Sequence, residues 1–273
     1  MSLNWSWSFS KSRSLQKCPR LFEYSLSNNN ENNQFLINLR ALAGVAIHSS
    51  IQVEMDKWSK GILVSPRESI ERATEFVERI WNNRNDQIIE VINGFTPNES
   101  YLDVTKVNVT RKLQRFYCSL WPRFSKYKHL FHERLEKFVV GKFNVYVKVD
   151  LACKNSEGDL YIIDWKTGSS TIESNQKIQL ATYTLWALLE LKEDISSIRP
   201  TIVNLDTGRV TTFQPTVQDI DFVRNLIQDD YDLVKLYDKG SNYPTFPELA
   251  KCTSCSYLNL CEEGRSLMRT GKS

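Results

Sequence analysis

The stretch that decides the fold is Leu160-Tyr161-Ile162-Ile163-Asp164-Trp165-Lys166-Thr167-Gly168. Its first four residues form a short apolar run, which is typical of a buried strand. Upstream, apolar residues alternate from Phe143 to Leu151, and Asn155-Ser156-Glu157-Gly158 has the composition of a turn. The two runs together predict a β-hairpin over residues 143–165 that ends in charged side chains.

Two aspartates lie where the strands of this hairpin end. Asp150 is near the end of the first strand and Asp164 at the end of the second, so the hairpin brings their carboxylates together. Mg²⁺ and Mn²⁺ prefer oxygen ligands, commonly one or two carboxylates with water and substrate phosphate. Lys166 shares a strand face with Asp164, whereas the Trp165 side chain points away and only its backbone carbonyl reaches the ion. The pattern predicts a divalent-metal site with a lysine beside it.

Such a site suits phosphodiester hydrolysis. The metal neutralises phosphate charge and lowers the pKa of its water, while Lys166 positions or deprotonates the nucleophile. For an isolated Asp-x-Lys, the simpler interpretation is a surface ion pair that closes a hairpin. Apolar residues that continue up to the charged end, with an aspartate across the turn, favour the metal site.

The remaining periodicity predicts an α/β order with a small mixed sheet. A short capped helix is expected within residues 8–24 and a loop over 27–34. Longer helices are expected at 35–58, 66–81, 120–138, 176–191 and 217–237, with a second strand pair at 200–205 and 209–213. We therefore expect an N-terminal hook (1–34), a core (35–60 and 138–240), a helical insertion (61–137) and a C-terminal cysteine segment (241–273).

The bulk composition sets only broad limits. With 273 residues, 41% of them hydrophobic, the chain can bury a sizeable core, and a net charge of +3 neither supports nor excludes nucleic acid. No apolar run approaches the ~18 residues of a membrane span, so a soluble cytoplasmic protein is expected. A GxxxxGK[ST] phosphate loop is absent from the sequence, which argues against an ATP-driven motor in this chain.

Six cysteines fall into two groups. Cys118 and Cys153 lie in apolar sequence and are expected to be inert core residues. The spacing C-x2-C-x5-C at 252, 255 and 261, with Cys18 as a fourth ligand, can hold one metal centre and fasten the two chain ends together. Four thiolates suit zinc or an iron–sulfur cluster equally, and free thiols are the simpler alternative.

The order Asp, turn, apolar strand, Asp-x-Lys-Thr-Gly resembles the PD-(D/E)XK nuclease superfamily, in particular its RecB-like branch. The resemblance implies a restriction-endonuclease-like core. It also implies that Asp150 and Asp164 are metal ligands and that Lys166 is the catalytic lysine. Family members often have a glycine three residues before the first aspartate, where this chain has Val147. Glu136 is a loose match to an upstream acidic position of the family.

Two further family motifs have counterparts in this chain. Gly44-Val45-Ala46-Ile47-His48 matches a helical Gly-x-x-x-His, which implies His48 as another metal ligand; by itself, a histidine on an apolar helix is more often a core residue. Gln179 and Tyr183 match a Gln-x-x-x-Tyr motif and share one helix face, where they would support DNA or the active site. Without the resemblance, they read equally well as the polar edge of an amphipathic helix.

The cysteine pattern resembles the CRISPR-associated RecB-like adaptation nucleases and the AddB-type nuclease domains. These proteins join one N-terminal and three C-terminal cysteines around a [4Fe–4S] cluster. The resemblance therefore implies such a cluster on Cys18, Cys252, Cys255 and Cys261, with zinc as the lesser alternative.

The implied function is a metal-dependent DNA exonuclease acting on single strands or DNA ends, in DNA repair or CRISPR adaptation. Because this chain has no motor motif, a helicase or an integrase is an expected partner. An alternative is a non-cleaving nucleic-acid-binding or adaptor subunit of a recombination, repair or adaptation complex, and another is a zinc-stabilised structural subunit. The combination of Asp150, Asp164 and Lys166 argues against the binding module, which has no need for it, whereas a brown colour of the purified protein would exclude zinc as the main occupant.

Overall fold

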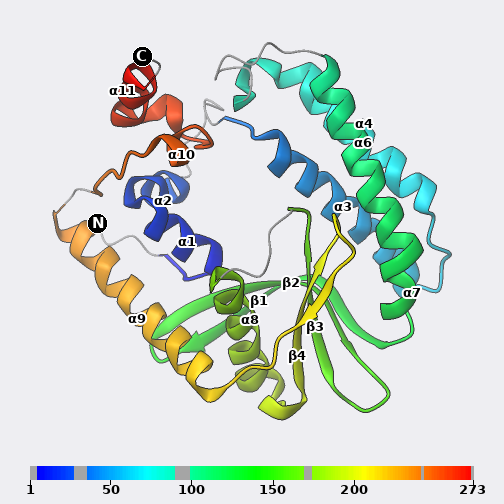
Figure 1. Cartoon of the computed structure of the whole chain (residues 1–273). Coiled ribbons are helices and arrows are strands. Elements are labelled where there is room, and N and C mark those ends of the chain that lie inside the picture. The colour runs from blue at the N-terminus through cyan, green and yellow to red at the C-terminus, as the bar shows by residue number, and fades with distance from the viewer. Residues whose placement is uncertain (1–4, 28–35, 90–98, 169–173, 241–242, 272–273) are drawn as a thin grey trace.

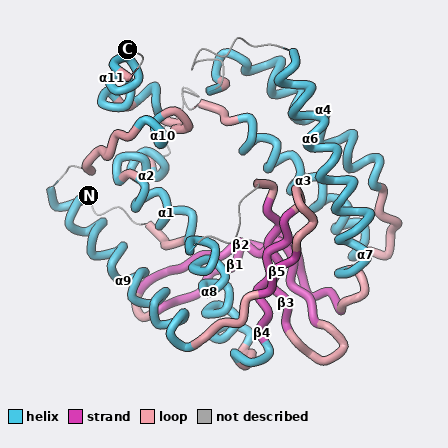
Figure 2. Tube along the Cα trace, viewed as in Figure 1, coloured by secondary structure: helices cyan, strands magenta, loops and turns pink. Residues whose placement is uncertain are grey.

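The computed structural model describes residues 5–27, 36–89, 99–168, 174–240 and 243–271. Within these ranges, the strands form one five-stranded sheet in the order β1-β2-β3-β4-β5 (Figures 1 and 2). Only the β3–β4 pair is parallel. The strands are β1 (Lys128–Val140), β2 (Phe143–Lys154), β3 (Leu160–Lys166), β4 (Ile198–Asn204) and β5 (Val210–Thr212). This mixed sheet between helices confirms the restriction-endonuclease-like α/β class.

The described helices lie on both faces of the sheet (Figure 1). One layer consists of α1 (Phe9–Lys17), α2 (Pro19–Leu26), α8 (Ser174–Trp186) and α9 (Val217–Gly240). The other consists of α3 (Leu39–Ser59), α4 (Pro66–Arg84), α6 (Glu99–Arg115) and α7 (Trp121–Phe124). The short helices α10 (Leu249–Cys252) and α11 (Glu262–Thr270) end the chain, and none of the described helices is long and apolar enough to cross a membrane.

Each face of the sheet has its own hydrophobic core, and β3 contributes to both. Leu160 and Ile162 pack with α8 and α9, whereas Ile163 and Trp165 pack with the layer of α3 and α6. The buried Trp165 ring makes edge contacts with aromatic rings of the helical layer, including Phe116 at 5.2 Å between centroids. Because side chains alternate along a strand, Asp164 and Lys166 are directed toward α8.

The helix predicted over residues 120–138 is wrong. Only α7 and the end of the preceding π-helical turn (Phe116–Leu120) are helical there, and Lys128–Val140 is the edge strand β1, paired with β2 over nearly its whole length. Its apolar, aromatic and charged residues follow the alternation of a strand with one buried face. The expected hairpin is therefore part of a three-stranded meander, and the stretch 61–137 is helical only as far as Phe124.

The N-terminal helix is also divided in two. Cys18 is extended between α1 and α2 with φ of −167°, and Pro19 begins the second helix, where its missing N–H costs no hydrogen bond. The other predicted helices and the second strand pair are present with shifted ends. Most of the predicted 27–34 loop lies outside the described residues.

Candidate active site

Helix α3 brings His48 to the end of the central strands. Asn38 caps this helix by accepting the backbone N–H groups of Arg40 and Ala41 at 3.0 and 3.1 Å. At Gly44, a Cβ atom would lie 3.1 Å from Thr167 Oγ1, so glycine permits a close approach to the loop after β3. His48 follows one helical turn later and therefore faces the strand ends.

His48 forms a compact group with Glu133 and Asp150. Its Nδ1 atom lies 3.6 Å from Glu133 Oε1 and 3.5 Å from Asp150 Oδ1. One ligand atom from each residue falls within 4.8 Å of the others, as a shared cation requires, and this is the single such group among the described histidine, cysteine and acidic residues. One nitrogen and two carboxylate donors suit Mn²⁺ or Mg²⁺.

Glu133 is the residue that the sequence pattern missed. Its neighbours pair as Arg134 with Val149 and His132 with Leu151, which places Glu133 opposite Asp150. Its φ of 45° is unusual for a residue other than glycine and is typical of functional sites. Glu136, the acidic position noted in the sequence, pairs instead with Arg134.

The Glu133 carboxylate is buried and lacks well-aligned hydrogen bonds from the described residues. It is held by charge, with Lys148 Nζ at 2.6 Å from Oε2 and His48 on the other side. A buried carboxylate with free lone pairs is a good ligand for a hard cation. The sequence does contain a signal for Glu133. If residues 128–140 form a strand paired with β2, Glu133 is the acidic residue opposite Asp150.

Burial and the neighbouring charged groups shift the pKa of all three residues. Burial disfavours the charge on His48, but hydrogen bonds and charges from Asp150 and Glu133 outweigh it and raise the His48 pKa to about 10. Burial likewise opposes the charge on Glu133, but His48 and Lys148 outweigh it and lower the Glu133 pKa. For Asp150, burial prevails and the pKa is raised. A bound divalent cation would take the place of the His48 proton.

Asp150 also joins the metal group to β3. The β2–β3 pairing reaches Leu151 and Ile163, and beyond that pair Asp150 Oδ2 accepts the Trp165 backbone N–H at 2.7 Å. This bond fixes the carboxylate between the two diverging strands. It also places the Trp165 backbone beside the site, although metal binding by the Trp165 carbonyl stays a prediction.

Asp164 and Lys166 form an adjoining network with helix α8. Lys166 Nζ lies 2.7 Å from Asp164 Oδ2 and donates to Gln179 Oε1 at 2.8 Å. Gln179 Nε2 in turn donates to Asp164 Oδ1 at 3.0 Å, and the Tyr183 hydroxyl lies 3.0 Å from the same oxygen. Burial and the Asp164 charge raise the pKa of Tyr183, so it stays a neutral hydrogen-bond donor. Gln179 and Tyr183 thus orient the lysine and the aspartate.

The predicted site residues therefore fall into two adjoining sets. His48 and Asp150 meet each other and Glu133, whereas Asp164, Lys166, Gln179 and Tyr183 meet one another. Asp164 lies outside the three-residue group of the described chain, and its oxygens face Lys166 and α8. The arrangement can hold a cation on one side of the Asp150–Trp165 junction and a positioned ammonium on the other.

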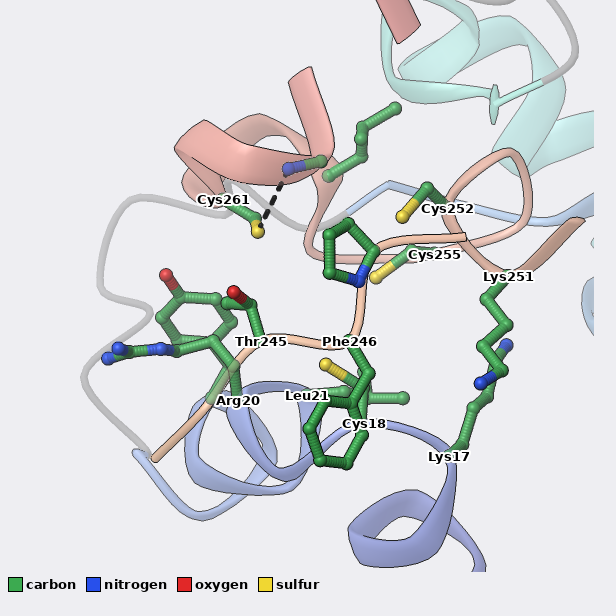
Figure 3. Close-up of a pocket in the computed structure, with 14 residues that line it drawn as sticks. Lys17, Cys18, Arg20, Leu21, Thr245, Phe246, Lys251, Cys252, Cys255 and Cys261 are labelled. Carbon is green, nitrogen blue, oxygen red and sulfur yellow. Dashed lines mark hydrogen bonds between the residues drawn. The ribbon is translucent and has the colours of Figure 1, made fainter. Parts of the chain in front are cut away.

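The four cysteines of the predicted cluster line one pocket between the chain ends (Figure 3). Cys18 lies between α1 and α2, Cys252 ends α10, and Cys261 is the N-cap of α11, where its sulfur accepts the Gly264 backbone N–H at 3.3 Å. Tyr24 Oη also donates to the Leu260 carbonyl at 3.1 Å, so the two terminal segments are in contact.

The other two cysteines differ from each other. Cys153 is buried, which confirms its expected place in the core, and burial raises the pKa of its thiol to about 12. The prediction that Cys118 is a core residue is wrong, because its side chain is exposed. It occupies the π-helical turn Phe116–Leu120, in which Phe116 and Tyr117 take the inward positions.

Comparisons with known proteins agree with this geometry. The model of the PD-(D/E)XK nuclease superfamily matches residues 6–262, whereas no curated protein matches the chain. A solved structure from Eubacterium rectale, described as a "putative exonuclease", is 12% identical and superposes with a TM-score of 0.55, covering 91% of this chain and 86% of that one. Another, described as SSO0001, is 14% identical with a TM-score of 0.35 and covers 93% and 96%.

The family match spans nearly the whole chain, including both sets of site residues. At such low identity, the Eubacterium rectale structure supports the fold alone. The acidic residues of β1, β2 and β3, the lysine two residues after Asp164 and the histidine of α3 supply the residues that metal-dependent phosphodiester hydrolysis needs. The chain belongs to the PD-(D/E)XK nuclease superfamily.

Proposed function

We propose that this nuclease is a metal-dependent deoxyribonuclease of the RecB-like branch. The observation that carries the proposal is the group formed by His48, Glu133 and Asp150, directly beside the Asp164–Lys166 pair. The Gly44–His48 and Gln179–Tyr183 spacings, which resemble motifs of that branch, support the assignment. A subunit that only binds DNA would have no need to bury three metal-binding groups next to an oriented lysine.

In this mechanism His48, Glu133 and Asp150 would hold Mg²⁺ or Mn²⁺. When bound, the cation neutralises phosphate charge and lowers the pKa of its water. Lys166 is held by Asp164 and Gln179, so its ammonium group would donate a hydrogen bond that orients the attacking water, and after losing its own proton the amine would accept one from that water. Asp150 accepts the Trp165 N–H and so fixes the distance between the two sets.

Exonuclease action on single strands or DNA ends is the more specific part of this proposal. It draws on the resemblance to RecB-like nucleases that trim DNA, and the Eubacterium rectale protein of similar fold is itself described as a "putative exonuclease". Because the sequence has no phosphate-loop motif, a separate helicase or integrase would supply unwinding or integration.

A [4Fe–4S] cluster on Cys18, Cys252, Cys255 and Cys261 belongs to the same proposal. The four residues fit a cluster because they line one pocket. Burial raises the pKa of the Cys255 and Cys261 thiols, and a bound metal would deprotonate them. A tetrahedral zinc ion, with Zn–S of about 2.3 Å, would draw the sulfurs to about 3.8 Å of one another. No three of these sulfurs meet within 4.8 Å in the described chain, so the preference for an iron–sulfur cluster over zinc rests on the resemblance of the cysteine pattern.

The cluster is tested by its colour and metal content. Protein purified without oxygen is expected to be brown and to contain about four iron atoms per chain. Cys255→Ser should remove the colour, whereas Cys118→Ser, at an exposed cysteine outside the pocket, should keep it. Colourless protein with one zinc ion would contradict the cluster and leave the nuclease proposal intact.

The nuclease proposal is tested with 5′- and 3′-labelled DNA strands and Mn²⁺ or Mg²⁺. The wild-type protein should shorten them, and Lys166→Ala should be inactive. Lys235→Ala is the control, because Lys235 is an exposed lysine on α9 outside both sets of site residues. Equal activity of wild-type protein and Lys166→Ala, or cleavage of RNA in place of DNA, would overturn the proposal.

A further inference from the structure

The β1–β2 hairpin extends well beyond the rest of the sheet. β3 pairs with β2 only over residues 151–154 of β2. The half of β2 before Asp150 therefore pairs with β1 along one edge, and the backbone of Trp7 lies along the opposite edge of β2. One face of this extension is part of a hydrophobic core, to which Phe138, Val145 and Val147 contribute. The opposite face is the subject of the inference.

Three cross-strand pairs form that opposite face. Residues directly opposed in an antiparallel pair share a face, and their immediate neighbours point the other way. Glu136 pairs with the core residue Val147, and Phe138 pairs with Val145. The intervening pairs therefore lie on the other face, which we name the open strip: Leu135 with Lys148, Lys137 with Tyr146, and Val139 with Asn144.

The open strip presents apolar side chains to solvent. Leu135 is 64% exposed and Val139 is 53% exposed, and Tyr146 between them is half-buried. Large exposed apolar residues in a row on an edge strand are a liability unless a ligand covers them. The strip thus has the composition of a binding surface.

The open strip leads directly to the metal site. Lys148 belongs to the strip, and its Nζ atom lies 2.6 Å from Glu133 Oε2. Val139 lies six residues along β1 from Glu133, which is about 20 Å at the usual strand rise of about 3.4 Å per residue. A substrate in the active site could therefore continue along this face for several nucleotides.

The chemistry of the strip fits a single nucleic-acid strand. Lys137 and Lys148 are exposed and basic, and the strip contains no acidic residue. In a duplex, the flat faces of the bases are hidden in the stack, and only phosphates and groove edges are presented. An unpaired strand presents its base faces, which stack on aromatic and apolar side chains, while lysines contact its phosphates.

We propose that the open strip is the path along which single-stranded nucleic acid reaches the metal site. Tyr146 stacks on a base, Leu135 and Val139 contact neighbouring bases, and Lys137 contacts a phosphate. The inference rests on the proposed function, because the strip begins at its active site. It adds the surface along which an unpaired strand reaches the site and the residues that select it over a duplex.

The test measures binding of single-stranded and duplex oligonucleotides to the full chain without a divalent cation, so that cleavage does not interfere. Tyr146→Ala should weaken single-strand binding about tenfold, because stacking contributes about 1–3 kcal/mol per base. Tyr146→Phe, which keeps the ring, should bind like the wild type. Duplex binding should change less than twofold in both variants.

A matched pair of leucines tests whether any exposed leucine side chain contributes to single-strand binding, or only one on the open strip. Leu135 and Leu236 are each 64% exposed, but Leu236 lies on α9, away from the strip. Leu135→Ala should weaken single-strand binding severalfold and Leu236→Ala should not. Thermal unfolding of each variant checks that the fold is kept, and Leu135→Ala tests the strip by itself if Tyr146→Ala unfolds.

Two results would overturn the inference without touching the nuclease proposal. If folded Tyr146→Ala and Leu135→Ala bind single strands as well as the wild type does, the strip serves another occupant, such as a protein partner. If single-strand and duplex binding fall equally, the strip does not select unpaired strands. Failure of the proposed function is separate: it would be absence of cleavage by the wild-type protein with Mn²⁺.

Discussion

The active site and the cysteine pocket both gather residues that are far apart in the sequence, but they are held in different ways. In the active site, ion pairs and hydrogen bonds already connect the functional groups, from His48 through Asp150 to Trp165. In the cysteine pocket, the four sulfurs surround a space, and the Cys261 sulfur accepts the Gly264 backbone N–H and donates to the Glu263 carboxylate.

This difference separates a site that the fold preorganises from one that the proposed cluster would complete. The active-site residues belong to β1, β2, β3, α3 and α8, which two hydrophobic cores fix in place. The cysteines belong to short terminal elements, and the small hydrophobic cluster beside them has three buried members, Leu36, Ile89 and Leu258. We therefore expect loss of an active-site group to affect chemistry, and loss of a cysteine to affect stability.

The largest effect is expected for Asp150→Asn. The amide oxygen can still accept the Trp165 N–H, but the site loses one carboxylate ligand, so cleavage should fall about a thousandfold, as for several kcal/mol of lost transition-state stabilisation. Single-turnover cleavage and thermal unfolding should be measured together. A large fall in the unfolding midpoint would show that Asp150 is as much a structural residue as the cysteines.

Replacing a pocket cysteine should give the opposite result. Cys255→Ser is expected to lower the unfolding midpoint by several degrees, because a bound cluster contributes to folding free energy. The affinity of the active site for Mn²⁺ should stay within about twofold, because the two sites share no residue. Cys118→Ser is the control. Unchanged stability in Cys255→Ser would remove the distinction between the two regions.

An intermediate effect is expected for the hydrogen bond that joins helix α6 to the backbone just after β3. Lys112 Nζ on α6 donates to the Thr167 carbonyl at 2.7 Å, and Lys112 is largely buried. Lys112→Met leaves that carbonyl without this donor, a loss of about 1–3 kcal/mol, and cleavage should slow several-fold. Lys106→Met, on the same helix but paired with Glu78, should cleave at the wild-type rate. Equal rates in both variants would show that α6 does not position the site.

The smallest effect concerns Asp230, which accepts the Trp7 indole N–H at 2.8 Å. Burial raises the pKa of Asp230 above its usual value, more than its hydrogen bonds lower it. The folded state therefore binds the proton more tightly than the unfolded state, and stability falls as pH rises from the usual carboxyl pKa to the raised one.

Asp230→Asn should remove this part of the pH dependence while keeping an acceptor for Trp7. Urea unfolding across the acidic range measures it, with a change expected to be below about 1 kcal/mol. An unchanged slope would mean that Asp230 has the same pKa in both states.

The sequence predicted the parts of this site that follow a regular pattern. The alternation before Asp150, the apolar run before Asp164 and the position of Lys166 depend only on strand periodicity, and all three lie on β2 or β3 as expected. The four cysteines around one pocket were likewise predicted from their spacing and the resemblance.

Glu133 could not be predicted in the same way. It lies on an edge strand whose mixture of aromatic and charged residues also suits a helix, and its backbone departs from strand geometry at the functional position. Its role depends on the long-range pairing of β1 with β2, which fixes it opposite Asp150. Local periodicity carries no information about that register.

The most direct test of the active-site account is Mn²⁺ binding by titration calorimetry to wild-type protein, Glu133→Gln and Glu136→Gln. Both variants lose one negative charge on the same strand, but only Glu133 belongs to the group with His48 and Asp150. We predict at least about tenfold weaker binding for Glu133→Gln and wild-type binding for Glu136→Gln. Equal affinities for Glu133→Gln and wild type would contradict the proposed metal site.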